Sequence, residues 1–343
     1  MAETNWDKIS SELSEGISKK QLWRTLRQFK EPDPTWLEPF GWLWQVKHEL
    51  VSEDKKALKL KLHSGQYQDA CETVLLRPRP NRFAVCLSTQ VGCAVACRFC
   101  ATGKMGFQRN LSVWEIVEQF LWAGWAARKF SSKPEQPVPL RNVVFMGMGE
   151  PLHNPVAVQE AIELLSHPKW FGLSLRSITL SSAGVPGKMI QMAKRFPRLR
   201  IALSLHSAEP HKRRWLVPKA VADLKLLWQA IQEINAIQND TLWLEIALIA
   251  GVNDSAQDAQ LLIEFCKGLN VEVNVIPYND TSHAPRDPDF RAPSPEVVDA
   301  FIAKVRNAGI FVTHRKTLGQ SIQAACGQLV TRSHLPSQSY LVQ

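Results

Sequence analysis

The sequence predicts an α/β fold, a parallel sheet with connecting helices and a small region before it. Six strand-like apolar runs recur between residues 82 and 278, and helix-like runs separate them. Helices that alternate with strands in this way connect parallel neighbours through right-handed crossovers. The length of 343 residues, 45% of them hydrophobic, suits one large domain with a small appendage, or two domains. By count and length, an open six-stranded barrel and a doubly wound sheet fit equally well.

The predicted elements follow one another in a regular order. The strand-like runs are RFAVCLST (82–89), NVVFMG (142–147), RSITLSS (176–182), RIALSLH (200–206), LWLEIALI (242–249) and VEVNVIPY (271–278). The helix-like runs are Val113–Lys129, Val156–Leu165, Gly187–Arg195, Asp223–Ile234, Ala256–Leu269 and Glu296–Ala308. A seventh short strand, IFVTHRK (310–316), and a helix near Ser321–Leu329 complete the main domain.

The chain on either side of this domain is predicted to be simpler. Residues 1 to about 45 are expected to form short helices, of which Ile17 to Phe29 is amphipathic. Runs such as ALKLKLHS (57–64) and ETVLLRP (72–78) indicate a small β-hairpin element. The tail after Thr331 is polar, and we expect it to be loose. The expected organisation is an accessory region over 1–70, a main domain over 71–331 and a tail over 332–343.

Composition narrows the class of protein. The 41 basic and 32 acidic residues give a net charge of +9, which favours an acidic partner such as nucleic acid but also fits an ordinary basic enzyme. The start, MAETNWDKISSELSEG, lacks the pattern of a secretory signal, and the most apolar stretch is far shorter than the ~20 residues of a membrane span. We therefore expect a cytosolic protein with no membrane contact. Its seven cysteines are then metal or catalytic thiols, not a disulfide framework.

Three cysteines stand together directly after the first strand. Cys93, Cys97 and Cys100, in GCAVACRFCATGKMGF, have the spacing C-x3-C-x2-C. This spacing suits a cuboidal iron–sulfur cluster, because each cysteine binds a different iron. With no fourth local cysteine, one iron keeps an open site, which the amino and carboxylate groups of S-adenosylmethionine (SAM) can chelate. The alternative is a structural zinc site completed by Cys86 or a histidine, but the usual second C-x2-C knuckle is absent from the sequence.

Strand ends further along the chain offer groups that could hold SAM. FMGMGEP (145–151) ends the second strand, where glycines allow close approach of a ligand and Glu150 can accept an ammonium group. SSAG (181–184), SLH (204–206) and PYN (277–279) follow later strands. Polar groups at the carboxyl ends of parallel strands face the binding mouth of such folds. A tight turn and a core histidine are the alternatives for FMGMGEP and His206.

The cysteine motif resembles that of the radical SAM superfamily, whose fold is a partial (β/α)6 barrel. More segments resemble the RlmN and Cfr family of adenine-carbon RNA methyltransferases, in the expected order over roughly residues 70–331. These segments are ETV, CLSTQVGC, CRFCATGKMGFQRNL, GMGEP, SLHS, GVND and AACGQL. The resemblance implies a [4Fe–4S] cluster on the three cysteines and a radical SAM barrel preceded by a small helical and hairpin region. It also implies SAM contacts at Gly149, Glu150, Ser181, Ser204, Leu205, His206 and Asn279.

The same resemblance assigns two cysteines outside the cluster. Cys326, in AACGQL, is expected to take a methyl group from one SAM, and a second SAM at the cluster gives the radical that removes a hydrogen from it. The carbon then adds to the adenine, which is not nucleophilic at carbon 2 or carbon 8. Glu72 accepts the ring proton, and Cys86 attacks the Cys326 sulfur, leaving a transient disulfide. Without the resemblance these cysteines would be small buried hydrophobes, as we expect for Cys71 and Cys266.

The implied partners are RNA and an electron donor such as flavodoxin or ferredoxin. Carbon 2 is favoured over carbon 8, the usual targets are 23S rRNA and the tRNA anticodon loop, and we expect a monomer. Two features depart from the family: the region before ETV is shorter than usual, and Gln320 and Gln323 stand where relatives carry acids. Basic residues that could contact phosphate, or be merely solvated, are Lys104, Arg109, Lys212, Arg213, Arg214, Arg315 and Lys316.

Two other functions compete with this one. A different radical SAM enzyme, acting on peptides or small molecules, would not need AACGQL or Cys86. A non-catalytic metal-holding RNA-binding protein would not need Glu72 and Glu150 together with both extra cysteines.

Overall fold

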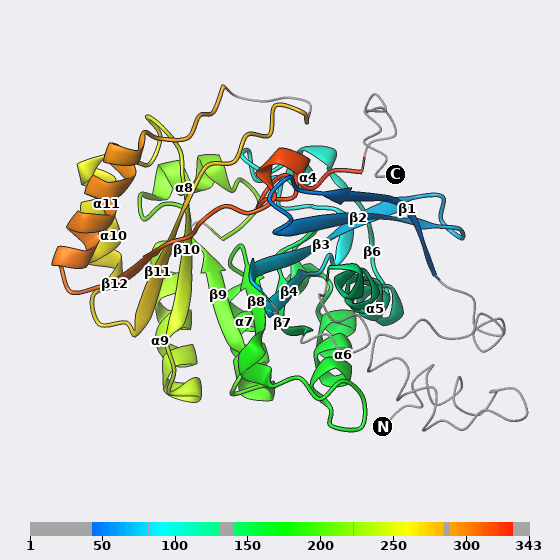
Figure 1. The fold of residues 1–343 in the computed structure, drawn as a ribbon. Helices are drawn as coiled ribbons and strands as arrows, with labels where there is room; N and C mark the ends of the chain where they lie inside the picture. The colour runs from blue at the N-terminus through cyan, green and yellow to red at the C-terminus, as the bar shows by residue number, and fades with distance from the viewer. Residues whose placement is uncertain (1–42, 81, 131–139, 222, 285–288, 332–343) are drawn as a thin grey trace, which may run out of the picture.

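A single mixed sheet of ten strands forms the centre of the molecule (Figure 1). The computed structural model describes residues 43–80, 82–130, 140–221, 223–284 and 289–331. The strand order is β1-β2-β3-β4-β7-β8-β9-β10-β11-β12. The helices expected before residue 43 and the tail expected after residue 331 lie outside the described residues, except for the last few positions of the former.

The parallel part of the sheet confirms the predicted fold class. All seven predicted strands are present and pair in parallel: β4 (Arg82–Cys86), β7 (Leu140–Phe145), β8 (Ile178–Ser182), β9 (Arg200–Ser204), β10 (Leu242–Leu248), β11 (Val271–Pro277) and β12 (Phe311–His314). Among the described strands, β12 pairs only with β11, so the sheet is open. This is the partial barrel, not a doubly wound sheet.

Helices connect these strands, as expected, and line the outside of the curved sheet in Figure 1. They are α5 (Val113–Lys129), α6 (Pro155–Ser166), α7 (Pro186–Arg195), α9 (Leu224–Gln238), α10 (Ala256–Cys266) and α11 (Pro295–Asn307). Capping fixes where they begin: Ser112 and Glu115 form a capping box at α5, and Ser255 and Asp258 form another at α10. Both boxes satisfy backbone N–H groups that have no partner inside the helix.

The predicted hairpin is part of the same sheet. β1 (Trp44–Val51), β2 (Ala57–Ser64) and β3 (Ala70–Arg79) are antiparallel, and β3 pairs with β4. The boundary expected at residue 70 coincides with the first residue of β3, and the sheet continues across it. β2 is buried on both faces, because one packs into the main core and the other is covered by residues 319–323.

The prediction of a helix near Ser321–Leu329 is wrong. Only a 3-10 turn, η3 (Gln320–Ile322), is present there. Gly319, Gln323 and Gly327 have φ of +75°, +53° and +84°, a left-handed conformation that a right-handed helix cannot include. We call residues 319–330 the Cys326 segment. In Figure 1 this red stretch runs from β12 back toward β2 and α4 (Ala101–Met105).

Short elements around the cysteine loop were not predicted. β5 (Gln90–Gly92) and β6 (Phe107–Asn110) form a two-stranded sheet at its base, and α8 (Pro210–Leu216) packs beside it. Gly92 must be glycine, since a Cβ there would lie 1.8 Å from the carbonyl oxygen of Gly106. Among the described helices, none combines the length and the apolar character needed to cross a membrane.

Candidate active site

A cavity lies at the carboxyl ends of the parallel strands, and we call it the first cavity. The cysteine loop, the glycine-rich end of β7 and the ends of β8 to β11 line it. Its lining residues include Cys93, Cys97, Cys100, Gly149, Glu150, Ser181, Ser204, His206, Glu245, Asn279, Arg315 and Cys326. The structure thus brings together all the expected cluster and SAM ligands except Leu205, whose side chain is fully buried elsewhere.

The loop with the three thiols is tightly folded. Its base is closed where the Cys93 N–H donates to the Gly106 carbonyl at 3.0 Å, and the Cys100 N–H donates to the Cys97 carbonyl at 3.2 Å. Gly103 permits this turn, because a Cβ there would lie 2.9 Å from the backbone of Cys97. The backbone therefore holds the three thiols in one small space.

The thiols fit an iron–sulfur cluster. Burial raises the pKa of Cys93 to about 12, and Cys100 adds to the rise. The pKa of Cys97 is raised by burial and by both other thiols, and all three cysteines line the first cavity. Thiolates gathered in a buried site require positive charge, which iron supplies. Among the described residues, no three cysteine, histidine or carboxylate side chains converge on one metal ion. A cluster does not need such convergence, because each cysteine binds a different iron.

The end of β7 depends on two close backbone approaches. A Cβ on Gly147 would lie 2.7 Å from the Leu87 carbonyl oxygen, and one on Gly149 would lie 2.6 Å from Gln90 Cβ. Gly149 also has φ of +101°. The Glu150 carboxylate accepts the Leu152 N–H at 3.0 Å and the Ala183 N–H at 2.7 Å, which ties the end of β7 to the end of β8. Burial raises the pKa of Glu150.

The ends of β8 and β9 present small polar groups and an imidazole. The hydroxyls of Ser181 and Ser204 lie 3.1 Å apart. His206 Nδ1 accepts the Ala247 N–H at 3.1 Å, and burial lowers the pKa of His206 to about 3. The ring is therefore neutral with its proton on Nε2, and it offers a hydrogen-bond donor to the cavity. Phe99, inside the cysteine loop, packs edge-on against it, with ring centroids 4.5 Å apart.

Arg213 forms hydrogen bonds with the backbone at the ends of β8 and β9. Its side chain is fully buried, and its guanidinium donates to the carbonyls of Ala183, Ser204 and Leu205 at 2.6 to 3.0 Å. The phosphate contact considered for Arg213 is therefore wrong. The sequence could not separate it from its neighbour Arg214, which is exposed on the same helix.

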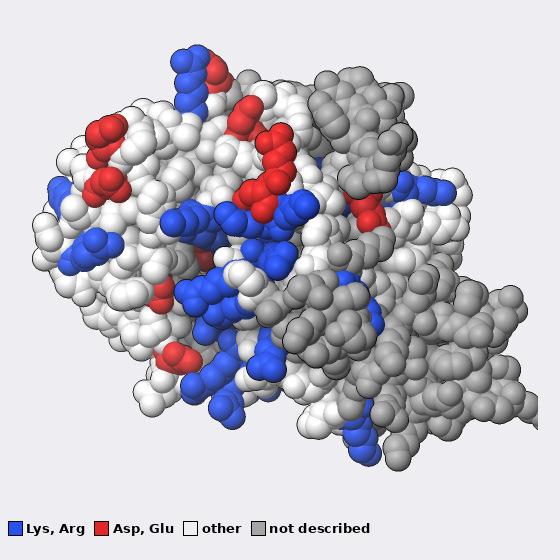
Figure 2. Space-filling view, in the orientation of Figure 1, with Lys and Arg blue, Asp and Glu red and all other residues white. Residues whose placement is uncertain are grey.

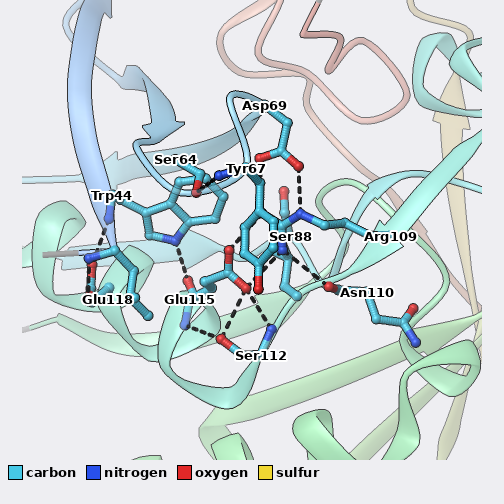
Figure 3. Close-up of polar contacts among 12 residues, drawn as sticks. Trp44, Ser64, Tyr67, Asp69, Ser88, Arg109, Asn110, Ser112, Glu115 and Glu118 are labelled. Carbon is cyan, nitrogen blue, oxygen red and sulfur yellow. Dashed lines mark hydrogen bonds and ion pairs between the residues drawn. The ribbon is translucent and has the colours of Figure 1, made fainter.

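Arg109 also has a structural role, not the phosphate contact considered for it (Figure 3). Its guanidinium binds Asp69 Oδ1 at 2.9 Å and Glu115 Oε1 at 2.7 Å, and it stacks on the Tyr67 ring with 4.0 Å to the centroid. The Trp44 indole N–H donates to the Glu115 carbonyl at 2.8 Å. This network joins the β2–β3 turn, β6 and the start of α5.

Other basic residues remain on the surface. On the face seen in Figure 1, Lys and Arg side chains gather over the middle, and acidic side chains lie mostly around them (Figure 2). Lys212 is partly exposed and pairs with Asp258 at 2.7 Å. Lys104 donates to the Thr281 hydroxyl at 2.8 Å. Lys316 lines a second cavity.

The second cavity lies beside the first and shares one wall with it. Met146, Ile276, Asn279, Arg315 and Cys326 line both. The rest of the second wall is largely apolar and includes Cys86, Val74, Leu76, Ala84, Val144 and Leu329. Cys326 thus lies on the wall that separates the cluster thiols from Cys86.

Arg315 lines both cavities with Cys326, and it shares the second cavity with Cys86. The negative charge that Cys326 can carry raises the pKa of Arg315, and Glu245 and Cys86 act in the same direction. Burial raises the pKa of Cys86 to about 12, with Cys326 adding and Arg315 opposing. The position of Arg315 in the sequence does not distinguish this placement from the phosphate contact considered for it.

The Cys326 segment is bound directly to the cysteine loop. The Ala101 N–H donates to the Gly327 carbonyl, and the Thr102 hydroxyl donates to the Leu329 carbonyl, both at 2.7 Å. The Asn279 side-chain amide donates to the Cys326 carbonyl at 3.0 Å. These hydrogen bonds join the Cys326 segment to the cysteine loop and to the end of β11.

Glu72 lies apart from both cavities. It is 3% exposed, pairs with Lys59 Nζ at 3.2 Å, and accepts the Val330 N–H at 3.0 Å. Burial raises the pKa of Glu72, and Lys59 opposes the rise. Sequence reasoning missed Lys59 and Glu245. Lys59 carries no distinct signal in the sequence, because Lys61 and His63 follow it at alternate positions of the same strand.

The chain is similar to known radical SAM proteins and RNA methyltransferases. Residues 87–263 match the family model described as the radical SAM superfamily. A probable RNA methyltransferase of Rhodopirellula baltica is 44% identical over 264 residues, which are 77% of this chain and 67% of that protein. A probable dual-specificity RNA methyltransferase RlmN of Treponema pallidum is 44% identical over 259 residues, 75% of this chain and 72% of that protein.

A solved structure is similar over almost the whole chain. The radical SAM methyltransferase from Sphaerobacter thermophilus superposes with a TM-score of 0.83 and is 32% identical. The match covers 94% of this chain and 95% of that one.

Proposed function

The chain belongs to the radical SAM superfamily and, within it, to the RlmN-type RNA methyltransferases, and on this premise we propose that it methylates an adenine ring carbon of rRNA or tRNA through Cys326. Carbon 2 is the proposed position, with carbon 8 as the alternative outcome. The family membership decides against a non-catalytic RNA-binding protein and against radical SAM enzymes of other substrate classes.

The observation that carries the proposal is the place of Cys326. Cys326 lines both cavities. The first cavity also contains the three cluster thiols, and the second contains Cys86. A sulfur that carries a one-carbon unit must face the group that activates the carbon and also the thiol that later releases it. No other described cysteine lines both cavities.

The chain's own residues suit both cofactors. Cys93, Cys97 and Cys100 would hold the [4Fe–4S] cluster. The residues that would hold SAM are Gly149, Glu150, Ser181, Ser204, His206 and Asn279, with Leu205 acting through its backbone. When bound, the cluster and SAM supply the one-electron chemistry that removes a hydrogen atom from a methyl group. The donor set supports this assignment: thiols for iron, and a carboxylate, hydroxyls and a neutral imidazole for SAM.

Cys326 and Cys86 divide the sulfur chemistry between them. Cys326 first holds the methyl group as a thioether, and its carbon then bonds to the adenine. The Cys86 thiolate attacks the Cys326 sulfur, and the sulfur–carbon bond breaks with its electron pair leaving on the carbon. That carbon takes up a proton and becomes the methyl group, and a Cys86–Cys326 disulfide forms. Attack requires a thiolate, and burial opposes that state in Cys86 by raising its pKa to about 12. The positive charge of Arg315 acts against this rise and supports the proposed attack.

Glu72 is proposed to accept the ring proton. Its side chain is buried and lines neither cavity, so this role requires the Cys326 segment to shift and admit the base. An external one-electron donor such as flavodoxin or ferredoxin completes the proposal, and we propose that the enzyme acts as a monomer.

Nucleoside mass spectrometry tests the proposal. Anaerobically reconstituted enzyme is incubated with SAM, a reductant, and unmodified rRNA or tRNA transcripts. Wild type should yield 2-methyladenosine, Cys326→Ala none, and Cys86→Ala protein covalently joined to RNA. Cys266→Ala is the matched control, because Cys266 is buried at the end of α10 and lines neither cavity. Full turnover by Cys326→Ala would overturn the proposal.

A further inference from the structure

A buried ion pair lies beneath the Cys326 segment. Lys59, on β2, and Glu72, on β3, lie 3.2 Å apart, and each side chain is 4% exposed. Both project to the face of the sheet that the Cys326 segment covers. Gly319 shows how close this covering is, because a Cβ there would lie 2.8 Å from the Cβ of Ala57.

Each member of the pair also holds the backbone of that segment. Lys59 Nζ donates to the Gln323 carbonyl at 3.2 Å, three residues before Cys326. Glu72 Oε2 accepts the Val330 N–H at 3.0 Å, four residues after it. The pair therefore binds the segment on both sides of the reactive sulfur.

A buried ion pair beneath the Cys326 segment costs more free energy than an apolar pair would. Burying an ammonium and a carboxylate carries a desolvation cost that an apolar pair of similar size avoids. Ala57, which lies on the same face of β2 as Lys59, is a buried apolar residue, so the surroundings accept an apolar side chain. The charges supply what an apolar pair lacks, one donor and one acceptor set at fixed positions for two backbone groups of the segment.

We propose that Lys59 and Glu72 are positioning residues that hold Cys326 on the wall between the two cavities. The inference rests on the proposed function for the role of Cys326, but the contacts can be tested without it. It gives Glu72 a task in this structure that differs from proton acceptance, and it assigns a function to Lys59.

The test uses reconstituted enzyme and two readouts that report the position of the segment. Hydrogen–deuterium exchange is followed in peptides covering residues 319–330, and iodoacetamide labelling of Cys326 is followed by peptide mass spectrometry. For Lys59→Met we expect both rates to rise at least about tenfold, because one anchor is lost and the remaining carboxylate is unpaired. Lys59→Arg should restore most of the protection, since it keeps a charged donor. Rates for Lys59→Met within about twofold of wild type would overturn the inference.

Two further variants make the result specific. Lys56→Met is the matched control: Lys56 pairs with Asp54 at 3.6 Å on the exposed β1–β2 turn, and the segment should be unchanged. Glu72→Gln keeps an acceptor for the Val330 N–H but loses the charge, so it should raise both rates by less than Lys59→Met. If Lys59→Met does not fold, Glu72→Gln decides, and wild-type rates in that variant would contradict the inference.

A third readout separates this inference from the proposed function. Methylation of Cys326 by SAM is followed by mass spectrometry, and this step needs no ring-proton acceptor. Slower Cys326 methylation in Lys59→Met supports positioning, whereas a wild-type rate contradicts it. If wild-type enzyme never methylates Cys326, the proposed function fails, and the exchange data still test the positioning role.

Discussion

Replacing Arg213 with Met should both destabilise the protein and weaken SAM binding at the proposed site. The guanidinium donates to four main-chain carbonyls, those of Ala183, Ser204, Leu205 and Val221. Each acceptor left without a donor costs about 1 kcal/mol, which sums to about 4 kcal/mol. Among the described residues Arg213 has no carboxylate partner, so removing its buried charge returns part of this, about 1–2 kcal/mol. The expected net loss of stability is about 2–3 kcal/mol.

The loss should be concentrated where the carbonyls lie. Two of them belong to the strand end that carries Ser204 and His206, so SAM affinity should fall at least about tenfold. Urea unfolding gives the stability, and equilibrium dialysis of reconstituted enzyme gives the affinity. Arg214→Met is the control, because Arg214 is exposed on the same helix. A change below about 0.5 kcal/mol together with unchanged SAM affinity would refute the reasoning.

Three other perturbations have defined outcomes. Gly149→Ala should weaken SAM binding at least about tenfold in equilibrium dialysis, because its Cβ would lie 2.6 Å from Gln90 Cβ at a φ of +101°. Unaltered binding would contradict the close approach. Burial raises the pKa of Glu118 from 4.5 to about 8. The folded protein therefore keeps a proton that the unfolded chain releases, and stability should fall between these pH values by on the order of 5 kcal/mol. In Glu118→Gln, urea midpoints should lose this slope, and a slope equal to that of wild type would argue against Glu118 as its source. Arg109→Met should lower stability by about 2 kcal/mol yet leave the salt dependence of RNA affinity unchanged, and a reduced slope would restore the phosphate contact.

The parallel sheet was predictable because its strands and helices carry local signals. β8, for example, is a short run buried at all five positions, and α5 starts at a serine followed by glutamate three residues later. Such features depend on residues that are close in the sequence and on burial. Runs of apolar residues indicate burial well. The order of the strand ends then brought the polar residues of the first cavity together.

The Cys326 segment was not predictable from local sequence. Alanine, glutamine and leucine favour a helix there, but backbone groups of the segment bind Lys59, Glu72 and Thr102, which lie more than 200 residues away in the chain. These long-range contacts outweigh the local preference.

Basic residues showed the same limit. Arg213 and Arg214 are adjacent in one charged run, yet helix geometry turns one inward and the other outward. Arg109 finds Asp69 forty residues earlier in the chain. The sequence shows which residues are charged, but the fold decides which groups each charged side chain contacts.

The most direct test of the central claim follows the hydrogens of the transferred methyl group. Enzyme given SAM with a CD3 methyl group should place on adenine a carbon that keeps two of the three deuteriums, because one is removed while the carbon is bound to Cys326. Mass spectrometry of the methylated nucleoside reads this number. A product that retains all three would contradict the account.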